Sequence, residues 1–421
     1  MNNNIRLFYF LPFLLLLSIS CEDSNTEDPI VTLDTPTEYV FESRFIDNES
    51  SVSYPGQVVR NLLINDIKSL VSNNVGGGNS ATITSMMANS DANLAIAAAS
   101  GLSTVQTKYH DISTSELNDL LGAVVDYVDP GYGANAQNMI AGWIAESAGY
   151  SIRPGGLDLG QMVQKVMWGA ISYWQGTSKY MSKIPDDNNT EQSGDDFYTA
   201  MEHHWDESYG YFGAARDYNT GYSDDNDRKT DPYYDSNGDG NIDFKSEYNM
   251  GWSVTAAKRD LVTASTDYDF TGTIMNAYLE GRALIYNQVP LEEILVQRDI
   301  ILENWEKVVA AVSIHYINDT MSDLAELITA GDSSLTYMNV GNSYLAHWAE
   351  MRAYAHGLIY NDFKLISDPD IAAVFGYMGN APVFNDGADF SGMQTLHDNL
   401  ALAKDILQAA YDFDDEHMAN W

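Results

Sequence analysis

The chain has 421 residues, with 60 aspartates and glutamates against 21 lysines and arginines, which gives a formal net charge of −39 at pH 7. Such a charge repels nucleic acid and anionic membrane surfaces and favours cations or neutral ligands, and it also keeps an exported protein soluble. A single cysteine excludes a disulfide framework, so stability must come from a core, and the length suffices for one large domain or two smaller ones.

The first twenty residues predict an export signal. After one basic residue, Arg6, the apolar run from Leu7 to Ile19 is too short to span a bilayer as a stable helix. Small residues then precede Cys21, the only cysteine, in a pattern that resembles a bacterial lipoprotein signal. We therefore expect residues 1–20 to be a signal peptide and Cys21 to become the lipidated anchor in the membrane. Ordinary secretion with an unmodified thiol is the alternative.

An acidic, polar stretch follows the cysteine. Residues 21–36 begin with CEDSNTED, which cannot bury a core, so we expect a disordered tether. The stretch also resembles the acidic signal that sends lipoproteins of Bacteroidota to the cell surface. The expected location is the cell envelope, as a lipoprotein of the outer membrane on either its periplasmic or its outer face.

From residue 37 onward the apolar spacing is overwhelmingly helical. Ser113 and Glu116 form a capping box ahead of an amphipathic stripe from Leu117 to Val128. Further helices are expected near residues 63–71, 90–101, 136–148, 159–175, 194–209, 247–262, 271–287, 291–330, 339–360 and 391–411. Strand-like alternation is confined to short pieces such as 38–43. The pattern predicts an all-α fold, built as one multi-helix bundle or as two packed helical bundles.

Polar breaks suggest how this helical domain is divided. It should cover residues 37–412, with a boundary between two sub-bundles near 185–194. Residues 217–246 form a long polar insert, and residues 413–421 form a C-terminal tail. No tandem repeat of fixed short period is visible.

The segment MEHHWDESYGYFG begins at Met201 and contains a histidine and a glutamate at helical spacing. His204 and Glu207 are three residues apart and project to one side of a helix. The apolar face of that helix should carry Phe197, Met201, His204 and Trp205, at offsets 0, 4, 7 and 8. We therefore expect His204 to face inward.

The same pattern recurs in YLAHWAEMRAYAHGLIYN, where His347 and Glu350 are again three apart around a tryptophan. In helical bundles, His and Glu pairs on facing helices converge on one ion, and imidazole with carboxylate suits iron, zinc or manganese. We predict that His204, Glu207, His347 and Glu350 hold a transition metal, iron or zinc. The alternative for each histidine is a core position satisfied by a hydrogen bond.

Two more polar residues are expected to face the core. His315 continues the seven-residue steps of Ile294, Ile301 and Val308. Arg282 shares a side with Met275 and Tyr278, where a buried guanidinium would need a carboxylate partner. Both are candidates to support the metal ligands, and a purely structural role is the alternative.

The sequence DSNGDGNID, residues 235–243, matches the first nine positions of an EF-hand-type calcium loop. The match then fails, because Ser246 stands at position 12 and the glutamate arrives one residue late. No helix of EF-hand type clearly precedes the loop, so we predict a lone stabilising calcium site, with a plain Asx-turn loop as the alternative. Its candidate ligands are Asp235, Asn237, Asp239, Asn241, Asp243 and Glu247.

Three stretches resemble a known family: YVFESRFIDNESSVSYPGQVVRNLL, HHWDESYGYFG and GRALIYN. They resemble Bacteroidota lipoproteins of unknown function, number 4856 in the domain-of-unknown-function series, over nearly the whole mature chain. That family looks related to imelysin-like proteins, exported helical-bundle proteins associated with iron uptake and once classed as metallopeptidases. Their motif Gly-x-His-x-x-Glu is met at His204 and Glu207, with Glu202 in the place of the glycine.

Together these observations predict an exported lipoprotein that binds a metal, namely iron, and partners an outer-membrane uptake receptor. A glycan- or nutrient-binding surface lipoprotein is one alternative, because 27 tyrosines and eight tryptophans offer faces that stack on sugars. A metal-dependent peptidase-like hydrolase is another, with the ion activating water. Motifs for nucleotide binding or for a catalytic serine or cysteine are absent, as are the basic clusters that nucleic acid requires.

Overall fold

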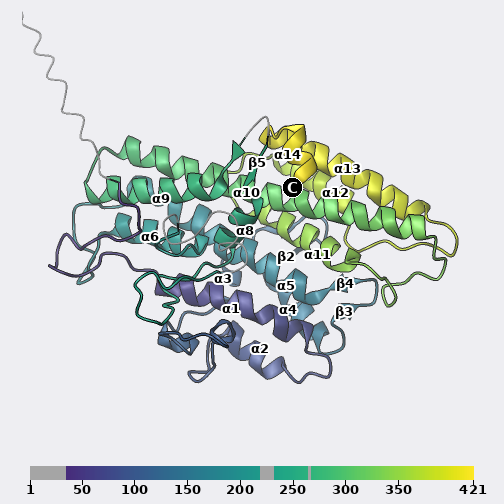
Figure 1. Ribbon diagram of the computed structural model, residues 1–421, viewed down its shortest axis with the longest axis horizontal. Helices are drawn as coiled ribbons and strands as arrows, with labels where there is room; N and C mark the ends of the chain where they lie inside the picture. The colour runs from purple at the N-terminus through teal and green to yellow at the C-terminus, as the bar shows by residue number, and fades with distance from the viewer. Residues whose placement is uncertain (1–34, 219–231, 264–266) are drawn as a thin grey trace, which may run out of the picture. The chain divides into compact units, whose positions relative to one another are not determined.

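Helices form the frame of the protein in the computed structural model, which describes residues 35–218, 232–263 and 267–421 (Figure 1). The predicted signal peptide, Cys21, most of the predicted tether and residues 219–231 of the predicted polar insert lie outside the described residues. Residues 35–421 form one compact unit. The helices are α1 (Pro55–Ser72), α2 (Ser80–Met87), α3 (Asn118–Gly122), α4 (Ala136–Ser147), α5 (Leu159–Met167), α6 (Ala200–Phe212), α8 (Trp252–Arg259), α9 (Phe270–Tyr286), α10 (Leu291–Ala330), α11 (Tyr344–Ala355), α12 (Asp368–Met378), α13 (Ser391–Tyr411) and α14 (Asp415–Asn420).

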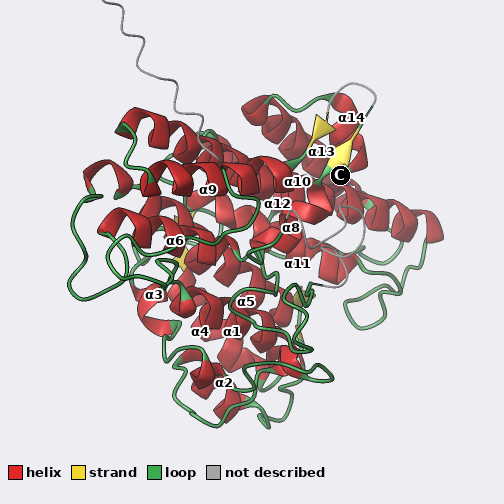
Figure 2. Ribbon diagram, turned by 60° about the vertical axis from the view of Figure 1, so that its left-hand side comes forward, coloured by secondary structure: helices red, strands yellow, loops and turns green. Residues whose placement is uncertain are grey.

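Shorter pieces connect these helices. Two π-helical turns, η3 (Trp168–Tyr173) and η4 (Gln175–Met181), continue α5, and 3-10 turns include η1 (Ala97–Ala99), η2 (Tyr109–Asp111), η5 (Ile184–Asp186) and η6 (His356–Ile359). The described strands are three two-residue antiparallel pairs, namely β1 (Val128–Asp129) with β2 (Ala134–Asn135), β3 (Ile152–Arg153) with β4 (Leu157–Asp158), and β5 (Leu261–Val262) with β6 (Asp267–Tyr268). Figure 2 shows how far helices outweigh strands. The predicted all-α, multi-helix fold is confirmed.

The long helix α10 is the central element, and α9, α11 and α13 pack along it. Helix α11 also packs against α5, which in turn packs against α1 and α4, while α6 packs against η4 and α9. Four fully buried tryptophans lie in the core between these helices: Trp205, Trp252, Trp305 and Trp348. Burying large aromatic side chains supplies the apolar area that holds such a unit together without disulfides.

Local signals explain where the principal helices begin and end. Thr199 caps α6 by accepting from the backbone N–H of Glu202, whose carboxylate in turn accepts from the Thr199 N–H. Gly213 ends α6 and Gly331 ends α10, each in a left-handed conformation that glycine adopts without strain. Glu292 and Glu293 lie in the first turn of α10, where negative charge complements the helix dipole.

Several predicted helices are shorter or begin later than expected. The stripe from Leu117 to Val128 forms only α3, because the chain turns after Gly122 and Val128 pairs with Asn135 across a Pro-Gly turn. The predicted capping box is wrong as well, since the Glu116 carboxylate accepts from the Asp119 N–H instead. Within the region expected as a helix near 90–101, only the three residues of η1 are helical.

The end of the chain packs onto the helices. Residues 413–421, expected as a tail, contain α14 and finish in Trp421, which is only 5% exposed. The Trp421 indole donates to the Arg259 carbonyl at 2.9 Å, which ties the C-terminus to the end of α8. In the described part of the chain, no helix combines the length and the apolar character that crossing a membrane requires.

Candidate functional site

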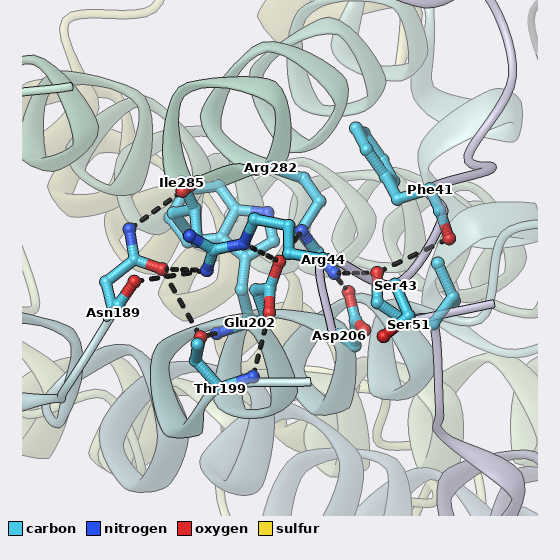
Figure 3. A network of polar contacts seen from close by, with 12 residues as sticks. Phe41, Ser43, Arg44, Ser51, Asn189, Thr199, Glu202, Asp206, Arg282 and Ile285 are labelled. Atoms are coloured by element: carbon cyan, nitrogen blue, oxygen red, sulfur yellow. Dashed lines mark hydrogen bonds and ion pairs between the residues drawn. The ribbon is translucent and has the colours of Figure 1, made fainter. Parts of the chain in front are cut away.

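The inner face of α6 carries a buried charge network with α9 (Figure 3). Arg282 donates from Nε to Asp206 at 2.9 Å and from Nη1 to Glu202 at 3.1 Å, and all three side chains are 0% exposed. The Tyr39 hydroxyl also donates to Asp206, at 2.7 Å. Burial raises the pKa of Asp206, and the neighbouring guanidinium opposes that shift. Arg282 therefore has two carboxylate partners where the sequence predicted one. Their ion pairs hold α6 against α9.

His204 lies at the rim of α6, with its side chain 19% exposed. The face that we expected to bury it counted Phe197, which precedes the start of α6 and therefore does not share the helical phase. One ring nitrogen, Nδ1, lies 2.7 Å from an Asp187 oxygen, and Nε2 lies 2.9 Å from the Lys183 ammonium. Because an ammonium only donates, Nε2 accepts and its lone pair is already used. A metal ion at this nitrogen would have to displace a cation.

Glu207 does not join His204. Its carboxylate accepts from the Gln57 amide at 2.9 Å and lies 3.7 Å from Nε2 of His203, the neighbouring histidine. The histidine and the glutamate of the first His-Trp-x-Glu pair therefore contact different residues.

The second pair is divided in a different way. The Glu350 carboxylate accepts from the Tyr316 hydroxyl at 3.1 Å and lies 3.4 Å from the Lys165 ammonium. His347 turns instead toward α10, where its Nδ1 lies 2.8 Å from an Asp323 oxygen. Lys165 and Tyr316 thus hold Glu350 away from the histidine.

His347 belongs to a group of four side chains on α10 and α11, which we call the α10/α11 cluster: His315, Asp319, Asp323 and His347. The Nε2 atoms of His315 and His347 lie 3.4 Å and 3.9 Å from the same Asp319 carboxylate oxygen. Each of these three side chains is about a third exposed or less, with relative exposures of 29%, 27% and 35% for His315, His347 and Asp319. The cluster is therefore at the rim of the bundle, in reach of solvent.

The two histidines of this cluster differ electrostatically. The hydrogen bond with Asp323 raises the pKa of His347, while burial and the neighbouring Arg259 guanidinium lower the pKa of His315 to about 4. His315 is consequently a neutral imidazole at pH 7, which is the form that ligates metals.

The two predicted pairs do not share a partner in the described residues. His204 contacts Lys183 and Asp187, which lie just before and just after η5, whereas His347 contacts α10. Both views of the unit place α6 and α11 in different regions (Figures 1 and 2). Across the described ranges, no three His, Cys, Asp or Glu side chains are already arranged to hold a metal ion.

The calcium-like loop is closed by its own hydrogen bonds. Asp235 accepts from the backbone N–H groups of Gly238 and Gly240, at 2.8 Å and 2.9 Å. Glu247, only 1% exposed, reaches back across the loop and accepts from the N–H groups of Asn237 and Asp243. Asn237 and Asp239 each accept a backbone N–H two residues on, while Asp243 accepts from the Gln106 amide. These Asx turns account for the fold of the loop, and calcium binding there stays a prediction.

Sequence reasoning missed Asp319 and Asp323. They follow His315 by four and eight residues, which places all three on one face of α10, so the spacing contained the signal. Asp187 and Lys183 gave no such signal because they flank a short 3-10 turn outside any periodic helix.

Comparison with known proteins yields one family. A family model described as a domain of unknown function (DUF4856) matches residues 36–344, which span α1 to the start of α11. No curated protein and no solved structure matches the chain. Because the match covers well over half of its length, the chain belongs to the DUF4856 family.

Proposed function

We propose that the protein is an exported lipoprotein that binds a transition-metal ion, iron or zinc, as part of metal acquisition, and that the ion binds at the α10/α11 cluster. The observation that carries the proposal is the approach of two imidazole Nε2 atoms to one Asp319 oxygen, at 3.4 Å and 3.9 Å. Ligand atoms bound tetrahedrally at metal distances of about 2.1 Å are roughly 3.4 Å apart. The His315 contact with Asp319 already has this spacing, and the His347 contact is longer by about half an ångström.

The surroundings of His347 favour a ligand role. A metal-bound histidine usually donates its other ring N–H to a carboxylate, which fixes the ring and leaves Nε2 free for the ion. Asp323 accepts from Nδ1 in this way, at 2.8 Å. The nearby Arg259 guanidinium opposes a cation, and the two aspartates offset it.

Two imidazoles and one carboxylate leave coordination positions open, since zinc takes four ligands and iron up to six. An incomplete ligand set at a rim that solvent reaches suits an ion that is taken up and passed on to an uptake receptor at the outer membrane. The carboxylate that a hydrolase would use nearby, Glu350, is held by Lys165 and Tyr316, which favours binding over hydrolysis.

The test is metal content and affinity of protein stripped with chelator and then titrated with Zn²⁺ or Fe²⁺. We expect a single bound ion whose stabilising effect reaches about 2.7 kcal/mol at a free-metal concentration of a hundred times Kd. His347→Ala and Asp319→Asn should abolish this effect, while His204→Ala should retain it. Circular dichroism verifies that each variant is folded.

Two results would contradict the proposal. One is the absence of any saturable binding of either ion. The other is a loss of binding in His204→Ala that equals the loss in His347→Ala, because the ion would then depend on the α6 pair rather than on α10 and α11.

A further inference from the structure

A cavity of about 220 Å³ lies beside α5, α8 and α11, apart from the α10/α11 cluster. None of the three proposed metal ligands lines it. The side chains that matter to its chemistry are Gln164, Lys165, Trp168, Tyr248, Lys258 and Tyr354.

The charge of this cavity is opposite to that of the chain. The protein carries 60 acidic residues against 21 basic ones, yet the described residues that line the cavity include two lysines and no aspartate or glutamate. Lys68 adds a third positive charge nearby. Burial is the largest cause that lowers the pKa of Lys165 and of Lys258, Lys68 lowers both further, and Glu350 acts in the opposite direction. Lysines that crowd together in so acidic a chain make a local site for an anion.

The two lining lysines have donors to spare. Lys165, only 7% exposed, donates to the Gln164 amide oxygen at 2.6 Å and lies 3.4 Å from Glu350. Since an ammonium has three N–H donors, one remains for a ligand. Lys258 is exposed at the cavity and has no hydrogen bond or ion pair within the described residues.

Three aromatic rings contribute to the wall, and the backbone leaves room for one of them. Gly251 has φ +53°, and a Cβ atom there would meet the Trp168 ring at 2.5 Å, so only glycine leaves room for this tryptophan. Trp168 also begins the π-helical turn η3, a distortion that frequently marks functional sites. Tyr248 and Tyr354 supply two more ring faces.

We propose that this cavity binds a small organic carboxylate, with the anionic group between Lys165 and Lys258 and a flat apolar face against Trp168. Aromatic acids and acidic sugars share this chemistry, because both present a carboxylate and a face that stacks on aromatic rings. The cavity is independent of the proposed metal site, and the inference does not rest on it.

The test titrates chelator-treated protein with sodium benzoate and with sodium D-glucuronate, using benzamide and glucose as the neutral counterparts. We expect at least one carboxylate to bind with a Kd of about 1 mM or tighter, and its neutral counterpart to bind at least tenfold more weakly. The carboxylate that binds more tightly shows whether the cavity prefers an aromatic acid or an acidic sugar. Because burial lowers the pKa of Lys165 to about 8, binding should weaken as the pH rises above that value.

Substitutions assign the binding to the cavity. Lys258→Met should weaken it by about tenfold, and Lys258→Arg should restore most of the affinity. Lys108→Met removes a partly exposed lysine that does not line the cavity and should change nothing. The proposal is overturned if neither carboxylate shows saturable binding, if the neutral counterparts bind equally well, or if Lys258→Met and Lys108→Met behave alike.

Discussion

On α6 and on α11 the same residue types occur as His-Trp-x-Glu, but the two segments meet different neighbours. The α6 tryptophan donates from its indole to the Tyr278 carbonyl on α9, whereas the buried indole N–H of Trp348 on α11 has no partner among the described residues. On α6 an ammonium occupies Nε2 of the histidine, and on α11 the equivalent nitrogen faces a second imidazole and a carboxylate. Spacing sets which side of a helix a pair lies on, and the neighbouring element decides what chemistry it has.

Replacing a buried arginine tests whether the charge network stabilises the position of α6. Arg282→Met would leave Asp206 buried without its cation and Glu202 with Arg44 alone, and breaking a buried pair from one side costs about 3–5 kcal/mol. Urea unfolding should report a loss of this size. Arg298→Met is the matched control, because its partner Asp299 is 63% exposed and such surface pairs contribute about 1 kcal/mol or less. Equal losses in the two variants would show that the buried network does not hold α6.

The packing of the α6 tryptophan provides the next test. A Cβ atom at Gly281 of α9 would lie 2.1 Å from the Trp205 ring, so Gly281→Ala should overpack the core and cost about 1–3 kcal/mol. Gly376→Ala, within α12, meets no atom within 4 Å and should stabilise the protein by about 0.5–1 kcal/mol, because alanine favours a helix. Thermal unfolding should show a lower Tm for Gly281→Ala and a higher Tm for Gly376→Ala than for the parent protein. A stabilised Gly281→Ala variant would contradict the packing described for Trp205.

Acid should affect the α11 side through His356, which follows that segment in η6 and is 1% exposed. Burial lowers the pKa of His356 to about 4 from its usual 6.5. The unfolded chain then binds the proton first, so stability is present above pH 6.5 and is lost as the pH falls toward 4. Between pH 7 and pH 5 this group alone accounts for about 2 kcal/mol. His356→Leu should lose that much less over the same interval.

The control for this pH effect is His397→Leu, which removes a half-exposed imidazole on α13. Urea unfolding at pH 7, 6 and 5 compares the variants with the parent protein. If His356→Leu and the parent lose stability in parallel, the buried imidazole is not the source of the acid sensitivity.

Long periodic helices could be predicted closely from the sequence. The bounds expected for 291–330 and 391–411 are those of α10 and α13, because uninterrupted apolar spacing outweighs local variation. The stripe from Leu117 failed because a turn and a strand pair compete with a short helix there. Helix starts shifted where the signal was a single residue, as with Thr199 before α6.

The candidate site was harder to predict, since its contacts join segments far apart in the chain. Spacing identified His347 and His315 individually, but no periodicity says that α10 and α11 lie together. The buried carboxylates opposite Arg282 show the same limit: a charge on an apolar face requires a partner, and only the packing of α6 on α9 identifies it.

The last prediction concerns Zn²⁺ affinity and distinguishes His347 from His204 directly. Asp323→Asn keeps an acceptor for Nδ1 of His347 but removes the charge that orients the ring, and such supporting groups typically change metal affinity by about 10–100-fold. We expect a value near the lower end, about tenfold, or roughly 1.4 kcal/mol, in a Zn²⁺ titration. Asp187→Asn makes the same change beside His204, whose other nitrogen Lys183 occupies, so the affinity should not move. A tenfold loss in Asp187→Asn with none in Asp323→Asn would reverse the comparison and assign the ion to α6.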